Sequence, residues 1–148
     1  MKPNNKGFTL LELMVVLFIM VLGFSIIGIN LSSGNNATEH QRAARDIVSA
    51  LRYARGMALM SHRETAVTFN LNENSYTVNN RDKVFTIPET IKVTVVTTQS
   101  QLLGQNQGSI RFFADGSSTG GRVSLKRGEN AWQIDINWLT GQIELKNN

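Results

Sequence analysis

The chain has 148 residues, a formal net charge of +4 and no cysteine. Without cysteine it can form neither disulfides nor thiolate metal sites, so an exported domain of this chain must be held by its core alone. Two of the positive charges, Lys2 and Lys6, stand in the first seven residues. The remaining charge is too weak to indicate a nucleic-acid-binding protein, and the length allows one domain of modest size.

The chain begins with a short basic leader, Met1–Gly7, and continues with an apolar run, Phe8–Ile29, whose one charge is Glu12. At about 1.5 Å of helical rise per residue, this run spans the roughly 30 Å hydrocarbon core of a bilayer. It is longer than the apolar region of a secretory signal peptide. The lysines of the leader keep the N-terminus cytoplasmic by the positive-inside rule. We therefore expect a single-pass membrane segment over residues 8–30, with the rest of the chain exported.

Glu12 is an acid near the start of this predicted membrane segment. A carboxylate costs roughly 2.5–3.5 kcal/mol at the centre of a membrane helix on insertion scales, and less near the interface. An acid in this place is therefore a functional hypothesis. The alternative is that the Glu12 side chain reaches the lipid headgroups and has no further role.

The string Lys6-Gly7-Phe8-Thr9-Leu10-Leu11-Glu12 resembles the cleavage and N-methylation motif of type IV prepilins and type II secretion pseudopilins. The resemblance implies that a prepilin peptidase/N-methyltransferase removes leader 1–7 by cutting between Gly7 and Phe8, and then methylates Phe8. Glycine suits a cleavage site because it has no side chain to clash in the protease cleft. The resemblance also implies that Glu12 of one subunit pairs with the Phe8 amine of its neighbour. Such a pair would set the axial register of a filament.

After the apolar run, Asn30–Asn36 is polar and contains glycine, which predicts a bend or short break. Thr38 is then a candidate N-cap for a helix over about 38–61. Apolar residues recur there at intervals of three and four, which predicts a half-buried helix: Ala44, Ile47, Val48, Leu51, Ala54, Ala58 and Leu59. Four arginines lie on and beside the opposite face, where we expect a solvated surface or contacts with sister subunits: Arg42, Arg45, Arg52 and Arg55.

From Thr65 onward, alternating patterns separated by glycine and asparagine turns predict strands. The expected strands are Thr65–Leu71, Ser75–Val78, Lys83–Ile87, Ile91–Thr97, Ile110–Phe113, Arg122–Leu125, Ala131–Trp138 and Gln142–Leu145. A helix laid on an antiparallel meander is an α+β arrangement. The expected fold is therefore pilin-like: a long N-terminal helix, half membrane-spanning and half amphipathic, packed on an antiparallel head. The head would cover residues 31–148, with its β-rich part over 65–146.

Three parts of the head resemble the H-type minor pseudopilins and the FimT-like minor pilins: the helix Ile47–Met60 and the stretches Ile110–Val123 and Ile136–Ile143. The resemblance implies a minor pseudopilin of the type II secretion system, in the tip region of the periplasmic pseudopilus that drives export of folded proteins across the outer membrane. Implied partners are other major and minor pseudopilins and the inner-membrane assembly platform. The implied location is the bacterial inner membrane, with a periplasmic head, and then the pseudopilus.

The alternative is a FimT- or FimU-like minor pilin of type IV pili, acting in pilus assembly or DNA uptake. Some FimT-like members bind DNA through a basic tail with a G-R-x-R pattern. This chain has Gly141-Gln142-Ile143-Glu144, so both arginine positions are lost and one is acidic. Several pilus-type members carry a cysteine pair in the head, which this chain lacks. These departures favour the secretion assignment and argue against a nucleic-acid partner.

No catalytic or metal-binding constellation emerges from the remaining motifs. Gly116–Gly120 satisfies G-x-S-x-G, but a strand follows it where a nucleophile elbow needs a helix. His40 and His62 lie about 33 Å apart along a continuous helix and cannot share a metal ion. Neither Asp115 nor Asn72–Asn74 has the spaced acids of a calcium loop. We therefore expect no enzyme activity, cofactor or metal.

The two tryptophans, Trp132 and Trp138, stand at even spacing on one predicted strand. Even spacing places side chains on the same face of a sheet. We expect both to pack in the core, and the alternative is an exposed surface that binds a partner.

Overall fold

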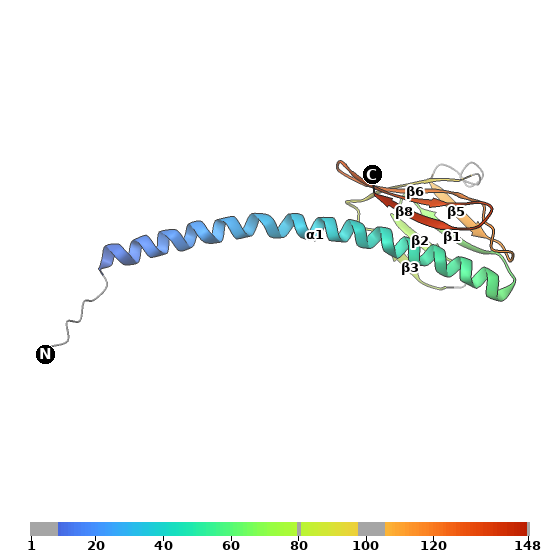
Figure 1. Ribbon diagram of the computed structural model, residues 1–148, viewed down its shortest axis with the longest axis horizontal. Coiled ribbons are helices and arrows are strands. Elements are labelled where there is room, and N and C mark those ends of the chain that lie inside the picture. The colour runs from blue at the N-terminus through green and yellow to red at the C-terminus, as the bar shows by residue number, and fades with distance from the viewer. Residues whose placement is uncertain (1–8, 80, 98–105, 148) are drawn as a thin grey trace. The chain divides into compact units, whose positions relative to one another are not determined.

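The computed structural model describes residues 9–79, 81–97 and 106–147; the side chains of residues 23–37 are not described. The chain forms one helix and eight strands within these residues (Figure 1). In chain order these are α1 (Leu10–Ser61), β1 (Thr65–Asn70), β2 (Ser75–Val78), β3 (Val84–Thr86), β4 (Lys92–Val96), β5 (Gln107–Phe112), β6 (Gly121–Arg127), β7 (Asn130–Ile136) and β8 (Ile143–Asn147). The chain divides into two compact units, Met1–Thr38 and Glu39–Asn148. The second unit is called the head below.

Helix α1 passes through Asn30–Asn36 without interruption, so the predicted break there is wrong. Glycine and asparagine each weaken a helix by about 1 kcal/mol or less, and extending an existing helix is far easier than starting one. Helical segments on both sides can therefore carry the backbone through this stretch. For the same reason Thr38 lies within the helix rather than at its N-cap. The helix ends at Ser61, and His62 follows with a positive φ of 52°, the left-handed conformation common after a helix.

The head contains two four-stranded antiparallel sheets, in the orders β3-β2-β1-β5 and β4-β6-β7-β8. The single meander expected from the sequence is therefore wrong in its topology. Strand β1 pairs with both β2 and β5, so Val67 faces Val78 on one side and Ile110 on the other. In the second sheet Val123 lies between Val95 and Ile134. A slip of one residue would turn these buried valines to solvent, which fixes the register.

All eight predicted strands occur in the predicted order, and β2 has the predicted bounds. The main difference lies at the end of β7, which stops at Ile136, so Trp138 lies in the following turn and not on the strand. Strand β5 begins at Gln107, three residues before the predicted start. The α+β class is confirmed, with helix and strands sharing one core.

The core of the head lies where α1 meets both sheets. Six of the seven residues of the predicted helical stripe are buried, and the exception is Leu59, which is 40% exposed. The largest fully buried side chains of the strands include Phe69, Phe112 and Leu125. Each such side chain contributes roughly 1.5–3 kcal/mol by leaving water. Within the head, the second half of α1 runs alongside the strands (Figure 1).

Candidate functional site

The predicted processing site, Gly7 and Phe8, lies outside the described residues. Helix α1 begins at Leu10, and Glu12 is the acidic residue of its first turn. The Glu12 backbone N–H donates to Thr9 Oγ1 at 3.2 Å, so Thr9 caps the helix. Thr9 and Glu12 have the spacing of a capping box, a signal that is visible in the sequence and could have located the start of the helix. The carboxylate therefore stands at the positive end of the helix dipole.

The first unit exposes its apolar side chains. Every apolar residue from Leu10 to Leu22 is exposed, between 45% at Val16 and 79% at Leu10. Within the described part of the chain, no helix has both the length and the apolar character needed to cross a bilayer. The predicted membrane segment includes Phe8 and side chains of residues 23–29 that lie outside the described part. The segment over residues 8–30 therefore stays a prediction.

Two adjacent side chains attach the start of the head helix to β6. Glu39 Oε2 accepts from Arg127 Nη1 at 3.0 Å, and His40 Nε2 lies 3.0 Å from the Leu125 carbonyl oxygen. Since a carbonyl can only accept, His40 carries its proton on Nε2 in this bond. His40 is only 3% exposed, so it is a structural residue of the core. The described residues contain no cluster of three or more acids and histidines that could hold a metal ion.

The turn between β7 and β8, Asn137–Gly141, is held from three sides; we call it the tryptophan turn. Asn137 Oδ1 accepts from the backbone N–H groups of Leu139 and Thr140 at 2.9 and 3.1 Å. Arg55 of α1 donates to the Thr140 carbonyl at 2.8 Å. The Trp138 carbonyl accepts from the Ser118 N–H at 2.8 Å. The helical pattern placed Arg55 on a solvated face and gave no sign of this role, because the partner lies far away in the sequence.

The segment Gly116–Gly120 supports the tryptophan turn. Ser118 Oγ donates to the Asn137 carbonyl at 3.0 Å and accepts from the Gly120 N–H at 3.0 Å. Its hydroxyl is therefore committed to holding the two loops together. Asp115 accepts from both the hydroxyl and the backbone N–H of Ser117, and these bonds lower the pKa of the Asp115 carboxyl. The G-x-S-x-G string thus folds as a hydrogen-bonded loop.

Trp138 is 66% exposed, so the expectation that it packs in the core is wrong. The strand ends two residues earlier, and the turn points its side chain outward. Its neighbour Leu139 is 63% exposed. Trp132, in contrast, is partly buried and packs against the core. The two tryptophans therefore have different roles, and Trp138 is an exposed apolar residue on a fixed turn.

The outer face of the second sheet carries a row of paired charges. Asp135 accepts from Arg122 and from Lys146, the latter at 3.1 Å, and Lys146 also pairs with Glu144 at 3.4 Å. The hydrogen bond from Arg122 is the main reason that the pKa of the Asp135 carboxyl is lowered, and Lys146 adds to it. These residues line a polar groove of about 560 Å³. The two positive and two negative charges of this row sum to zero, so the row has no net charge to attract an ionic ligand.

Two models of known protein families match this chain. The model described as "Type II transport protein GspH" matches residues 43–141, and the model described as "Prokaryotic N-terminal methylation motif" matches residues 2–28. A curated relative, type II secretion system protein H of Xanthomonas campestris pv. campestris, is 27% identical over 141 residues. That alignment covers 93% of this chain and 81% of the relative.

Two solved structures have a similar fold. The type IV minor pilin FimU of Pseudomonas aeruginosa matches with a TM-score of 0.59 at 14% identity, covering 75% of this chain and 90% of FimU. The minor pseudopilin EpsH of the Vibrio cholerae type 2 secretion system matches with a TM-score of 0.58 at 13% identity, covering 74% of this chain and 97% of EpsH. At these identities the likeness concerns the fold alone. The pilin-like fold expected from the sequence is confirmed.

Proposed function

Because this chain belongs to the type II transport protein GspH family, we propose that it is a minor pseudopilin of the type II secretion system. In this proposal it joins the tip region of the periplasmic pseudopilus that drives folded proteins across the outer membrane. The single observation that carries the proposal is the family match over residues 43–141, which covers most of the head. The methylation motif over residues 2–28 supports it from the other end of the chain.

The proposal includes processing at the N-terminus. A prepilin peptidase/N-methyltransferase cuts between Gly7 and Phe8 and methylates Phe8. The match to the N-terminal methylation motif supports this step. Helix α1 begins at Leu10, beyond the proposed cut, and Thr9 caps it. The mature subunit thus keeps the cap of its helix after the leader is removed.

The exposed apolar side chains of the first unit support a membrane anchor and then a filament spine. Before assembly, the segment over residues 8–30 lies in the inner membrane, with the N-terminus cytoplasmic and the head periplasmic. After assembly, it packs against the corresponding helices of other pseudopilins. Glu12, exposed in the first turn, pairs with the Phe8 amine of a neighbouring subunit and sets the axial register. The inner-membrane assembly platform is the further partner in this step.

A second candidate function is that of a FimU-like minor pilin, because the fold of FimU matches as well as that of EpsH. The tail after the tryptophan turn favours secretion. At the two positions where the DNA-binding pattern has arginine, this chain has Gln142 and Glu144. Glu144 is occupied in the ion pair with Lys146. These two positions therefore supply no cation for phosphates.

Deletion of the gene in the source bacterium separates the two functions. The proposal predicts that secreted proteins accumulate in the periplasm and that the full-length chain restores their export, while surface pili are unaffected. A gel-shift assay with the purified full chain supplies the second arm. Loss of pili with normal secretion, or tight and salt-sensitive DNA binding, would overturn the secretion assignment in favour of the minor pilin.

A further inference from the structure

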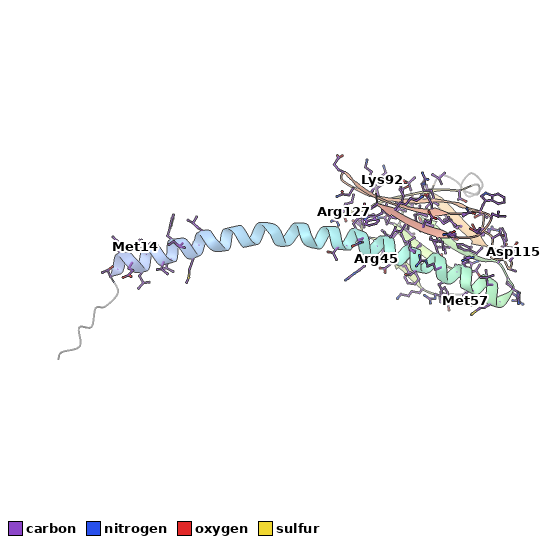
Figure 2. The ribbon with its side chains drawn as sticks, viewed as in Figure 1. Met14, Arg45, Met57, Lys92, Asp115 and Arg127 are labelled. Carbon is purple, nitrogen blue, oxygen red and sulfur yellow. The ribbon has the colours of Figure 1, made fainter. Side chains whose placement is uncertain are left out.

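Within the head, the face of α1 that points away from the core carries three arginines. Arg42, Arg45 and Arg52 are all exposed. At 3.6 residues per turn they lie within an arc of about 80° around the helix, and Ser49 and Gly56 lie within the same arc. The position of Arg45 on α1 is labelled in Figure 2. We call these five residues the arginine face.

The three arginines of this face have no acidic partner in the described part of the chain. None of them forms an ion pair there, although Asp46 lies on the same helix, four residues after Arg42. Other arginines of the head do pair with acids, among them Arg111, Arg122 and Arg127. Those pairs join elements of the head to one another, whereas the arginine face directs its charge outward.

The surface beside the arginine face adds to its positive charge. Arg42 lines the groove between α1 and the β2–β3 hairpin together with two further cations, Arg81 and Lys83. Two acids, Glu39 and Asp46, also line it, and Glu39 is occupied in its ion pair with β6. Three cations therefore stand against one acid without an ion pair. A surface with this balance attracts an acidic partner.

The kind of cation on α1 also indicates a binding surface. Within the head, all four cations of the helix are arginines, whereas the rest of the head has four lysines and five arginines. Arginine is enriched at protein interfaces and lysine is depleted there. The guanidinium group is weakly hydrated and binds a carboxylate through two parallel hydrogen bonds. Lysine would serve equally well on a surface that only had to remain hydrated.

Gly56 gives a second, independent sign of close approach. Glycine weakens the interior of a helix relative to alanine. A Cβ at this position would meet nothing within 4 Å, and Gly56 is not among the glycines with a positive φ. Neither the packing of the head nor its backbone conformation therefore requires glycine here. A helix without a side chain at this point lets the backbone of a partner come close.

We propose that the arginine face binds an acidic surface of another pseudopilin. Arg45 and Arg52 pair with carboxylates of the partner, and Gly56 lets the partner approach the helix closely. Charge complementarity identifies the partner surface as acidic. The inference rests on the proposed function and deepens it, because it names the chemistry of one contact between the head and a neighbouring subunit.

Charge reversal in the full chain, expressed in the bacterium that lacks the native copy, tests the proposal. We expect Arg45→Glu combined with Arg52→Glu to lower incorporation into cross-linked pseudopilin complexes at least about tenfold. Thermal unfolding of the purified chain should not change, because both side chains are exposed. Arg63→Glu is the matched control, since Arg63 is also exposed and forms no ion pair within the described residues. Parental incorporation of the double variant, or an equal loss in the control, would overturn the proposal.

The absence of native cysteine allows the partner's contact residues to be identified. Ser49→Cys places a photoreactive maleimide in the arginine face, and Thr94→Cys places it at an exposed position of β4 as the control. We expect position 49 to cross-link to another pseudopilin at a peptide that contains aspartate or glutamate, about tenfold more than position 94 does. A cross-linked peptide without acids, or an adduct with lipid or DNA instead of a pseudopilin, would overturn the acidic protein partner.

The same experiments distinguish this inference from the proposed function. A double variant that assembles and restores secretion like the parent contradicts the role of the arginine face and leaves the minor pseudopilin standing. A parental chain that fails to restore secretion contradicts the proposed function itself.

Discussion

The first unit and the head use their apolar residues in opposite ways. In the first unit, the side chains from Leu10 to Leu22 are exposed. In the head, Phe69, Phe112 and Leu125 are completely buried. A hydrophobic surface that the chain does not cover needs another cover, which in our proposal is first lipid and then other subunits. The contrast indicates that the buried apolar residues of the head stabilise its fold, whereas the exposed apolar residues of the first unit serve assembly.

The largest expected effect separates processing from folding. Substitution Gly7→Leu places a side chain in the peptidase cleft, so we expect complete retention of the leader and no change in the unfolding of the head. Cleavage is measured as a mobility shift on a gel or by mass spectrometry of the intact chain. Asn5→Leu is the control within the leader, and it should be cut normally. Normal cleavage of the Gly7→Leu chain would contradict the predicted site.

The core of the head should respond strongly to truncation. Phe112→Ala removes a completely buried ring, and we expect the free energy of unfolding to fall by about 3–5 kcal/mol. Denaturant unfolding followed by circular dichroism measures it. Val96→Ala in the head and Leu17→Ala in the first unit are the controls, since both side chains are more than half exposed. A large loss of head stability in Leu17→Ala would contradict the contrast, because it would show that an exposed apolar residue of the first unit also stabilises the head.

Two glycines with similar backbone conformation test how tightly the tryptophan turn is packed. Gly141 and Gly128 have positive φ angles of 62° and 58°, but only Gly141 lies against other atoms. We expect Gly128→Ala to cost about 1 kcal/mol from backbone strain alone, and Gly141→Ala at least about twice as much. Thermal unfolding of the two variants compares them directly. Equal destabilisation would show that the packing against Gly116 contributes nothing.

The smallest expected effect concerns the charged row on the second sheet. The pKa of Asp135 is lowered in the folded state, so its ionised form stabilises the head above the unfolded pKa of about 3.9, and this contribution is lost as pH falls through the folded value. Asp135→Asn should therefore be less stable than the parent at pH 7, and the difference should shrink below about pH 4. Unfolding curves at several pH values measure it, with the exposed Glu89→Gln as control. A difference independent of pH would contradict the role of ionisation.

Local patterns in the sequence predict much of the head. The three- and four-residue spacing from Ala44 to Ala58 gives the buried face of α1, and alternation gives all eight strands. His40 follows the same rule in retrospect, since it precedes Ala44 by four residues and is buried with it. Each of these features depends on residues within one helix or strand, so the periodicity of the sequence is enough to predict it.

Features that depend on distant partners could not be predicted. The helical periodicity places Arg55 on the exposed face of α1. In the structure it donates to the Thr140 carbonyl of the tryptophan turn, which lies 85 residues later in the sequence. Tyr53 of α1 likewise has a partner distant in the sequence, since Arg81 lies 3.8 Å from the centre of its ring. The uninterrupted helix through Asn30–Asn36 shows how helical context overrides weak local propensities. The processing site at Gly7 and Phe8 rests on the motif, because it lies outside the described residues.

The most direct test of the division between folding and assembly is Glu12→Gln in the full chain, expressed in the bacterium that lacks the native copy. The substitution keeps the size of the side chain and removes its charge, so the proposed pair with the Phe8 amine cannot form. The measurements are leader cleavage, incorporation into cross-linked pseudopilin complexes, and secretion. We predict normal cleavage and a normally folded head, with loss of incorporation and of secretion. Incorporation and secretion at the parental level would contradict the assembly role of Glu12.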